Sequence, residues 1–202
     1  MMEHTDWEQC YIEGDTPWDQ GSPSPVLVEY LDANSVTGRV VAPGCGSGHD
    51  VAEIARRSDL VSVLGMDISP SAVSLANTRL EALANASCEH ADLFDLQQHH
   101  IGQYDWVCEH TCFCAIDPSR RSDYVNAVHQ LLKSGGKLLA VFYLSPKPRE
   151  DGVAGPPFGC SIEELDALFD GRFVLEESRV PEVAFPGREG RELLRVFRRN
   201  PE

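Results

Sequence analysis

The sequence predicts an α/β fold: one open, mostly parallel sheet of seven strands with helices on both faces. Three observations favour it. Short apolar runs alternate along the chain with segments of helical periodicity, which is typical of parallel strands joined by helices. A glycine-rich turn, Gly44-Cys45-Gly46-Ser47-Gly48, separates one such run from a helical pattern. Acidic residues follow or close three successive expected strands.

The expected strands are short apolar runs bounded by turn residues, at 39–42, 61–66, 87–90, 105–109, 137–144, 173–179 and 192–198. One helix is expected at 47–57, directly after the glycine turn. Other helices begin at capping signals, which are Ser69-Pro70, Asp117-Pro118, and Ser161 with Glu164. Gly135-Gly136 is expected to end the helix that Asp117 opens, because glycine favours the left-handed residue that follows a helix.

A chain of 202 residues is long enough for one domain with a substantial core. We expect a single domain, in which residues 1–36 form an N-terminal lid and helix and residues 37–202 form the α/β core. Trp7 and Tyr11 are four residues apart and share one helix face, and Trp18 follows after a break at Gly14. These rings either pack on the core or close over a ligand.

The charge balance argues against several partners. With 17 basic and 32 acidic residues the formal net charge is −15, and such a surface repels phosphate backbones and anionic lipid. We therefore expect no nucleic acid and no membrane as a partner, and no apolar run is long enough to cross a bilayer. The acidic, polar N-terminus is unlike a secretory signal. We expect a cytoplasmic monomer.

The seven cysteines are scattered and odd in number, which predicts free thiols rather than a disulfide framework. Cys108, Cys112 and Cys114 with His110 come nearest to a metal-binding set, but a second pair of ligands is missing. We expect no metal, and buried thiols or pocket walls at these positions.

The spacing of the glycine turn distinguishes two kinds of nucleotide site. A dinucleotide-binding turn has the spacing Gly-x-Gly-x-x-Gly, and here His49 stands at the position of the third glycine. Gly44, Gly46 and Gly48 instead follow the pattern of Rossmann-like S-adenosylmethionine (SAM) methyltransferases. Glycines let the backbone approach a ligand, and the amides of the next helix can donate to it. This disfavours an NAD(P) oxidoreductase and leaves a plain strand–helix connection as the alternative.

Three carboxylates are expected at the edge where an open α/β sheet binds its ligand. Asp67 closes the second strand and can accept hydrogen bonds from ribose hydroxyls, with Ile68 beside it against an adenine ring. Asp92 follows the third strand and can accept from an adenine amino group. Glu109 ends the fourth strand, near the expected position of the sulfonium methyl. Each could alone be a surface acid, but three at successive strand ends indicate a nucleoside.

Two segments are more specific than the glycine turn: Thr16-Pro17-Trp18-Asp19-Gln20-Gly21 and Cys112-Phe113-Cys114-Ala115-Ile116-Asp117-Pro118. With them the chain resembles the thiopurine S-methyltransferase family, and more closely its thiol and halide methyltransferase branch. The resemblance covers nearly the whole chain. The other matching segments are Trp7-Glu8-Gln9-Cys10-Tyr11, Pro43-Gly44-Cys45-Gly46-Ser47-Gly48-His49-Asp50-Val51, Gly65-Met66-Asp67-Ile68-Ser69, Leu131-Leu132-Lys133-Ser134-Gly135-Gly136 and Gly155-Pro156-Pro157-Phe158.

The resemblance implies the fold of a class I SAM-dependent methyltransferase, with sulfur or another soft nucleophile as the acceptor. It also implies that aromatic residues of the N-terminal segment 7–20, here called the prelude, help to hold SAM. Together with the strand-end residues, the expected cofactor-binding set is Trp7, Tyr11, Trp18, Gly44, Gly46, Asp67, Ile68, Asp92, Leu93, Glu109 and His110. Tyr11 stands where the plant enzymes usually have Trp, and His110 where relatives have Tyr or Arg, which leaves the acceptor open.

A sulfonium methyl is already activated, so the protein has mainly to align a nucleophile and exclude water. A thiol with a pKa of about 8.5 is partly ionised at neutral pH. His110 is the candidate if a general base is used, because its ordinary pKa lies near neutrality; a packed or cofactor-contacting role is the alternative. The expected acceptor wall, under the loop 151–159, comprises Trp18, Phe113, Cys114 and Phe158.

We therefore expect a SAM-dependent enzyme that methylates a small thiol such as sulfide or methanethiol, with halides as further acceptors. An aromatic thiol such as a thiopurine, or a metalloid such as a selenium or tellurium species, is the first alternative. A SAM-binding module without catalysis is the second, although an intact acceptor loop with Phe158 argues against it.

Overall fold

The computed structural model describes residues 5–57, 61–147 and 155–201. Seven strands form one sheet in the order β3-β2-β1-β4-β5-β7-β6. All neighbouring pairs are parallel except those of β7, which runs antiparallel to both β5 and β6. The strands are β1 (Gly38–Pro43), β2 (Val61–Asp67), β3 (Ala86–His90), β4 (Tyr104–His110), β5 (Leu132–Tyr143), β6 (Phe173–Arg179) and β7 (Glu192–Arg199). The expected mostly parallel sheet is confirmed.

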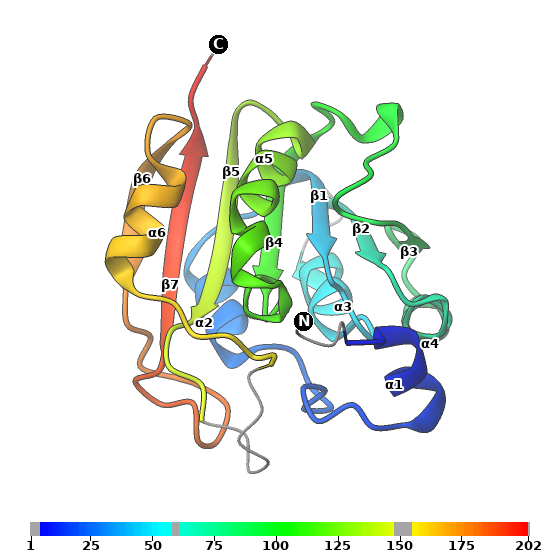
Figure 1. Cartoon of the computed structure of the whole chain (residues 1–202). Coiled ribbons are helices and arrows are strands. Elements are labelled where there is room, and N and C mark those ends of the chain that lie inside the picture. Colours follow the sequence, from blue (N-terminus) through cyan, green and yellow to red (C-terminus); the bar gives the residue numbers. More distant parts are fainter. Residues whose placement is uncertain (1–4, 58–60, 148–154, 202) are drawn as a thin grey trace.

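Helices cover both faces of this sheet (Figure 1), with α5 and α6 in front of it and α2 and α3 behind it. The helices are α1 (Trp7–Glu13), α2 (Pro25–Ala33), α3 (His49–Arg57), α4 (Pro70–Leu80), α5 (Arg121–Leu131) and α6 (Ile162–Phe169). Short 3-10 turns are η1 (Gln98–His100), η2 (Phe113–Ala115) and η3 (Pro118–Arg120). No helix in the described ranges is long and apolar enough to cross a membrane.

Two hydrophobic clusters lie on opposite faces of the sheet because successive strand residues point to opposite sides. Within β1, Val40 and Ala42 belong to the cluster that α2, α3 and α4 cover, whereas Val41 belongs to the cluster under α5 and α6. Aromatic rings fill the second cluster: Phe169 of α6 stacks on Phe197 of β7, with ring centroids 4.4 Å apart. Burial on both faces explains why the central strands are apolar runs rather than alternating patterns.

Two of the three expected caps are present, at Ser69 and Ser161, and Ser24 caps α2 in the same way. Asp117 instead caps the short turn η3, and α5 begins at Arg121 without a side-chain cap. Ser24 Oγ accepts from the Leu27 amide, Ser69 Oγ from the Ala72 amide, and Ser161 Oγ from the Glu164 amide. Each bond satisfies an amide that the first turn of a helix would otherwise leave without a partner. The capping signals therefore fix the starts of α2, α4 and α6, and with them the loops at the ends of the strands.

The chain between α5 and β5 differs from the expectation. Gly135 was expected to end a helix, but α5 already ends at Leu131 and β5 begins at the next residue, Leu132. The register against β4 shifts there, since Tyr104 pairs with Leu132 and Trp106 with Lys137. Gly135 has φ 74°, so it serves as the turn of this bulge rather than as a helix cap. Helix α3 begins at His49, two residues later than expected, because the glycine turn continues to Gly48.

Candidate active site

The order in which the chain adds strands to the sheet reverses between β1 and β4. From β1 it proceeds to β2 and β3 on one side, and then returns to β4 on the other side of β1. Ligands of open α/β sheets bind at such a switch point, beyond the carboxyl ends of the strands. The pocket found there is lined by the turn after β1, the end of β4, the N-terminal prelude, and Phe185 from the β6–β7 connection. In Figure 1 the carboxyl ends of β1 and β4 point toward the lower side, where α1 also lies.

The glycine turn leaves no room for side chains. Gly44, Gly46 and Gly48 have φ values of 60°, 53° and 81°. A Cβ on Gly44 would lie 2.9 Å from Cys112 Sγ, and one on Gly46 would lie 2.8 Å from the Tyr11 hydroxyl. Both the left-handed backbone and the close approach of neighbours therefore require glycine.

Asp67, at the end of β2, holds this turn. Its Oδ2 accepts from the Gly46 amide at 2.8 Å and its Oδ1 from the Ser69 amide at 2.9 Å. The side chain is buried, and burial raises the pKa of Asp67 although both amide hydrogen bonds oppose the rise. The carboxylate thus links the turn after β1 to the end of β2. This structural role does not depend on a bound ligand.

The prelude (residues 7–20) docks at two places, the start of α4 and the glycine turn before α3. Glu8 of α1 accepts from the Ser69 hydroxyl at 2.5 Å and the Ser71 amide at 3.0 Å, both at the start of α4. Asp19 accepts from the Ser47 hydroxyl at 2.5 Å and lies 3.2 Å from His49 Nε2. Although burial raises the pKa of Asp19, these partners bring it below its usual range. The segment 16–21, which is one of the two more specific segments of the sequence, therefore contacts the glycine turn directly.

Two aromatic side chains of the prelude face the pocket. The Trp18 indole Nε1 donates to the Tyr11 hydroxyl at 3.1 Å, and the two rings meet edge to face with centroids 5.8 Å apart. Trp7 packs against the other side of Trp18, with centroids 5.1 Å apart. The three aromatic residues thus form one cluster, and Tyr11 and Trp18 line the pocket.

His110, the last residue of β4, lies between two carboxylates. Its Nδ1 is 3.2 Å from Asp50 Oδ2 and its Nε2 is 3.9 Å from Glu192 Oε1, while its ring stacks on Phe185. Burial lowers the pKa of His110, but the bonds to Asp50 and Glu192 outweigh it and raise the pKa to about 9. Arg188 Nη1 lies 3.4 Å from His110 Nε2 and donates to the same Glu192 Oε1 at 3.3 Å.

Glu109 precedes His110 and lines the same pocket. One oxygen, Oε2, accepts from the Phe113 amide at 2.8 Å. The other, Oε1, is buried and has no hydrogen-bond partner among the described residues. Burial raises the pKa of Glu109 to about 7, against the opposing effects of the Phe113 amide and His110. A buried carboxylate oxygen without a partner is costly, which indicates that this end of the pocket is shaped for a donor or a cation.

Six of the predicted site residues line the pocket: Tyr11, Trp18, Gly44, Gly46, Glu109 and His110. The others lie outside its lining. Ile68 and Asp92 are exposed, and Asp92 accepts from the Phe94 amide. Leu93 packs against the cluster under α5.

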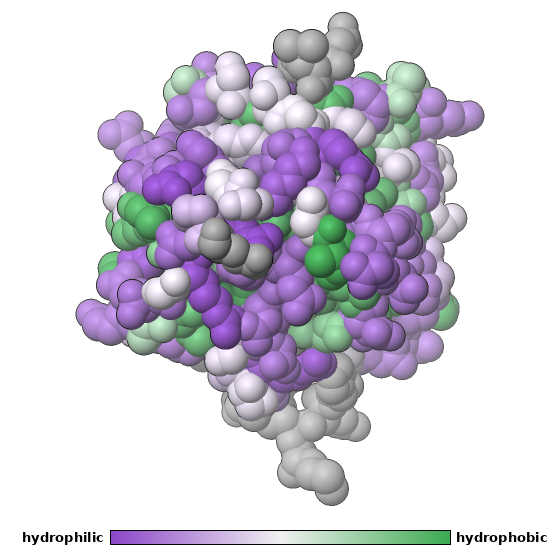
Figure 2. Space-filling view, turned by 90° about the horizontal axis from the view of Figure 1, so that it is seen from above, coloured by the Kyte–Doolittle hydropathy of each residue, from purple (hydrophilic) through white to green (hydrophobic). Residues whose placement is uncertain are grey.

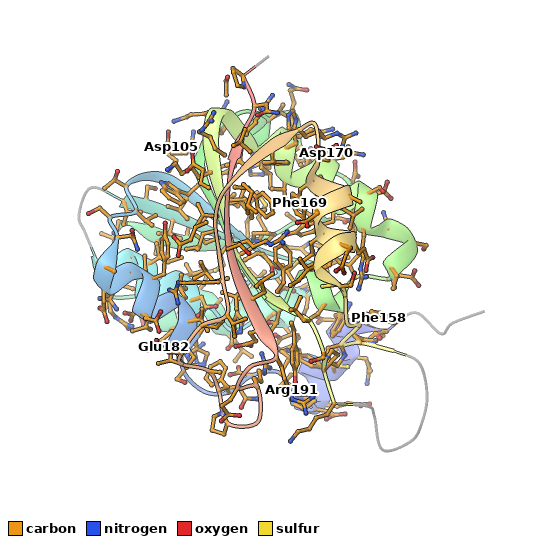
Figure 3. The ribbon with its side chains drawn as sticks, turned by 90° about the vertical axis from the view of Figure 1, so that its left-hand side faces the viewer. Asp105, Phe158, Phe169, Asp170, Glu182 and Arg191 are labelled. Atoms are coloured by element: carbon orange, nitrogen blue, oxygen red, sulfur yellow. The ribbon has the colours of Figure 1, made fainter. Side chains whose placement is uncertain are left out.

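Only part of the predicted acceptor wall lines the pocket. Trp18 lines the pocket, but Phe113 is buried in the core between Tyr124 and Phe142, and Cys114 is buried beside it. Figure 3 places Phe158 at the same end of the molecule as Arg191, and Asp105 at the opposite end. The Phe158 amide donates to the Cys114 carbonyl at 2.7 Å. Residues 151–154 of the expected covering loop lie outside the described residues.

Sequence reasoning missed Phe185, Arg188 and Glu192, which surround His110. They come from the β6–β7 connection and the start of β7, and no local pattern marks them. Asp50 was present in a matching segment, but its contact with His110 joins two residues that are 60 positions apart in the chain. The available signal in the sequence was that Glu192 begins an expected strand and is followed directly by two leucines.

The pocket residues fit SAM. Three carboxylates line it, namely Asp19, Asp50 and Glu109, and they favour a cationic ligand. The rings of Tyr11 and Trp18 present faces that attract a sulfonium. Gly44 and Gly46 line the pocket without side chains, so a nucleoside can approach their backbone. Sheet order, glycine turn and acidic pocket together define a class I SAM-dependent methyltransferase.

The sequence itself narrows this class. The chain matches the family model "Thiopurine S-methyltransferase (TPMT)" over residues 2–198. It is 34% identical over 198 residues to thiocyanate methyltransferase 1 of Arabidopsis thaliana, covering 96% of this chain and 84% of the relative. It is 33% identical over 166 residues to the probable thiol methyltransferase 2 of the same plant, covering 80% and 70%. The chain belongs to the thiopurine S-methyltransferase family, and its cofactor is SAM.

Solved structures agree on the fold. The 1,6-didemethyltoxoflavin-N1-methyltransferase of Burkholderia thailandensis, with bound S-adenosylhomocysteine, superposes with a TM-score of 0.74 at 18% identity, covering 96% of this chain and 86% of that one. A SAM-dependent methyltransferase of Methanosarcina mazei gives a TM-score of 0.71 at 20% identity, covering 90% and 100%. The expected class I methyltransferase fold is confirmed.

Proposed function

We propose that this enzyme transfers a methyl group from SAM to the sulfur of a small thiol, with the thiolate as the reacting species. The observation that carries the proposal is the imidazole of His110, which lines an otherwise acidic pocket and has Arg188 Nη1 3.4 Å from its Nε2. The carboxylates of the pocket suit the cation that donates the methyl group, whereas the imidazolium can hold an anionic acceptor. The family membership supports sulfur as the accepting atom.

SAM, when bound, supplies an activated methyl group. Asp67 and the glycine turn would hold its nucleoside, and Tyr11 and Trp18 would cover its sulfonium region. Glu109 Oε1 would face its positive charge, because this oxygen has no other partner in the described chain. These residues thus orient the donor and exclude water, which is most of what this reaction requires of a protein.

His110 would act as a fixed cation rather than as a general base. With its pKa raised to about 9, it is protonated at neutral pH and cannot take a proton from a thiol. A protonated imidazole beside the acceptor instead lowers the free energy of the thiolate and so raises the ionised fraction. The acceptor's proton then leaves to solvent when the acceptor binds, and no base is needed at the moment of transfer.

The acceptor is small in this proposal. Phe185 stacks on His110 with centroids 5.9 Å apart and lines the pocket beside it. Sulfide and methanethiol fit such a site, and so does thiocyanate, the anion for which the Arabidopsis relative is named. An aromatic thiol, a metalloid or a halide remains a second candidate, since each is also a soft nucleophile.

Three further features are part of the proposal. Residues 1–36 act as a lid, supported by the contacts of Glu8 with the start of α4 and of Asp19 with the glycine turn. The protein works as a monomer in the cytoplasm, supported by its seven free cysteines and its strong negative charge. The single domain suffices for catalysis.

A competition among acceptors tests the proposal. The enzyme is mixed with SAM and, in parallel, with sulfide, methanethiol, thiocyanate, iodide and an aromatic thiol, and products are quantified by mass spectrometry. We expect the highest kcat/KM for a small sulfur anion. A preference for the aromatic thiol would replace the small-acceptor proposal by the second candidate, and tight SAM binding without any product would favour the non-catalytic module.

A further inference from the structure

A second cluster of ligand-bearing side chains lies away from the pocket, between β3 and the connection that leads to β4. Glu89 comes from β3, and His99 and His100 come from η1. One carboxylate oxygen and one ring nitrogen from each histidine lie within 4.8 Å of one another. None of the three residues lines the pocket or belongs to the segments on which the family resemblance depends.

The connection that carries the two histidines lies at the end of the sheet away from α1, at the upper right of Figure 1. The space-filling view from above shows that end of the molecule as mainly hydrophilic (Figure 2). A polar ligand would therefore reach it from solvent without crossing an apolar surface.

His100 is the fixed member of the cluster. It is buried, and its Nδ1 lies 2.8 Å from the Tyr104 hydroxyl. Its Nε2 lies 2.6 Å from Glu89 Oε1, so the ring nitrogen and the carboxylate already face each other. An ion that enters here would replace this direct contact and take both atoms as ligands.

The position of the ring also suits a metal. An imidazole whose Nδ1 is held by a hydrogen bond presents its Nε2 in a fixed direction, as in many zinc sites. His99 is exposed, and its ring centroid is 3.9 Å from that of His100, so a small rotation suffices for it to join.

We infer that Glu89, His99 and His100 form a binding site for a divalent transition-metal cation. Two imidazole nitrogens with one carboxylate favour Zn²⁺ over Mg²⁺ or Ca²⁺, which prefer oxygen ligands throughout. Water completes the coordination, because Glu89 and His99 both reach the solvent. The ion would tie η1 to β3 and stabilise the β3–β4 connection.

The site is tested with the purified, metal-free protein by titration with Zn²⁺, followed by the ¹H–¹⁵N signals of the histidine rings. We expect one equivalent to shift the ring signals of His99 and His100 first, and the temperature of unfolding to rise with added Zn²⁺. His99→Gln and Glu89→Gln should each weaken this binding by at least about tenfold. His90→Gln, an exposed neighbour of Glu89 outside the cluster, should leave it unchanged.

Both substitutions remove solvent-accessible groups, so the fold should survive them, and circular dichroism checks this. Co²⁺ provides a second probe, since coordination by cysteine thiolates gives a strong charge-transfer band that a histidine–carboxylate site lacks. Binding that is equally strong in His99→Gln and the wild type would overturn the inference. So would a thiolate band at the first equivalent of Co²⁺. The readouts do not involve methyl transfer, and their outcome is therefore independent of the proposed function.

Discussion

The imidazole Nδ1 of His110 lies 3.2 Å from Asp50 Oδ2, which joins the end of β4 to the first turn of α3. Asp50 is held in turn, because its Oδ1 accepts from the Ser24 amide at 2.7 Å. The ring therefore has a fixed orientation, and its positive charge has a partner on the side facing α3. The positive charge that we propose for acceptor binding thus depends on three separate segments of the chain, which contribute Ser24, Asp50 and His110.

The first prediction concerns His110 and stability. Its pKa is about 9 in the folded protein against an ordinary 6.5, so the folded state binds this proton more tightly than the unfolded state. Its contribution to the free energy of unfolding is fully present below pH 6.5 and is lost as the pH rises through 9. For a group this far buried we expect a loss of roughly 3 kcal/mol.

Urea unfolding of the wild type and His110→Gln at pH 6 and pH 9 measures this effect. The wild type should exceed the variant by more at pH 6 than at pH 9. An equal difference at the two pH values would show that the imidazole does not gain a proton on folding.

The second prediction concerns Glu109 and SAM. Its carboxyl has a pKa of about 7 in the free protein, so its negative charge is lost as the pH falls below that value. If Oε1 faces the cation of SAM, the affinity for SAM should fall between pH 8 and pH 6, and Glu109→Gln should remove most of this dependence. Calorimetric titration with S-adenosylmethionine at several pH values provides the measurement; identical pH profiles for both proteins would rule out the role of Glu109.

The third prediction concerns Asp67. Replacing it with Asn keeps the shape but removes a charged acceptor that serves both the Gly46 amide and, in our proposal, the ribose. We expect SAM affinity to fall by roughly 1–3 kcal/mol. Asp95→Asn, an exposed carboxylate after β3, is the matched control and should bind SAM as the wild type does. Unchanged affinity in Asp67→Asn would place the ribose elsewhere.

The fourth prediction separates steric contact from backbone strain. Gly46→Ala would place a Cβ 2.8 Å from the Tyr11 hydroxyl, at φ 53°. Gly14→Ala has a comparable φ of 73°, but its Cβ would have no neighbour within 4 Å. Both variants should lose about 1 kcal/mol of stability from strain. Only Gly46→Ala should also lose SAM affinity, measured by calorimetry, because α1 can no longer seat over the turn; equal affinities would contradict the contact.

The sequence predicted what depends on local chemistry. Ser69-Pro70 and Ser161 begin helices where their side chains can cap the first turn, and apolar runs form strands that are buried on both faces. The glycine turn was predictable in both position and shape, because no other residue type tolerates a positive φ three times in five residues. Asp67 was predictable as an acid at the end of a strand, because it directly follows the expected strand 61–66.

What depends on long-range packing was not predictable. The surroundings of His110 require β7 to insert antiparallel between β5 and β6, which brings Glu192 and Arg188 beside the end of β4. Nothing in the sequence of residues 185–192 indicates that they lie beside the end of β4. Phe113 was predicted to face the acceptor because its segment is distinctive, but its ring fills the core against Phe142. A distinctive segment can therefore reflect packing beneath a site as well as the site itself.

Methyl transfer to sulfur is tested most directly by a single-turnover reaction with SAM that carries a deuterated methyl group and with methanethiol as the acceptor, followed by headspace mass spectrometry. We expect dimethyl sulfide with one deuterated methyl group, formed in proportion to the enzyme and at a lower rate in His110→Gln. Deuterated methyl groups found only on oxygen or nitrogen acceptors, with none on sulfur in any thiol supplied, would contradict this expectation.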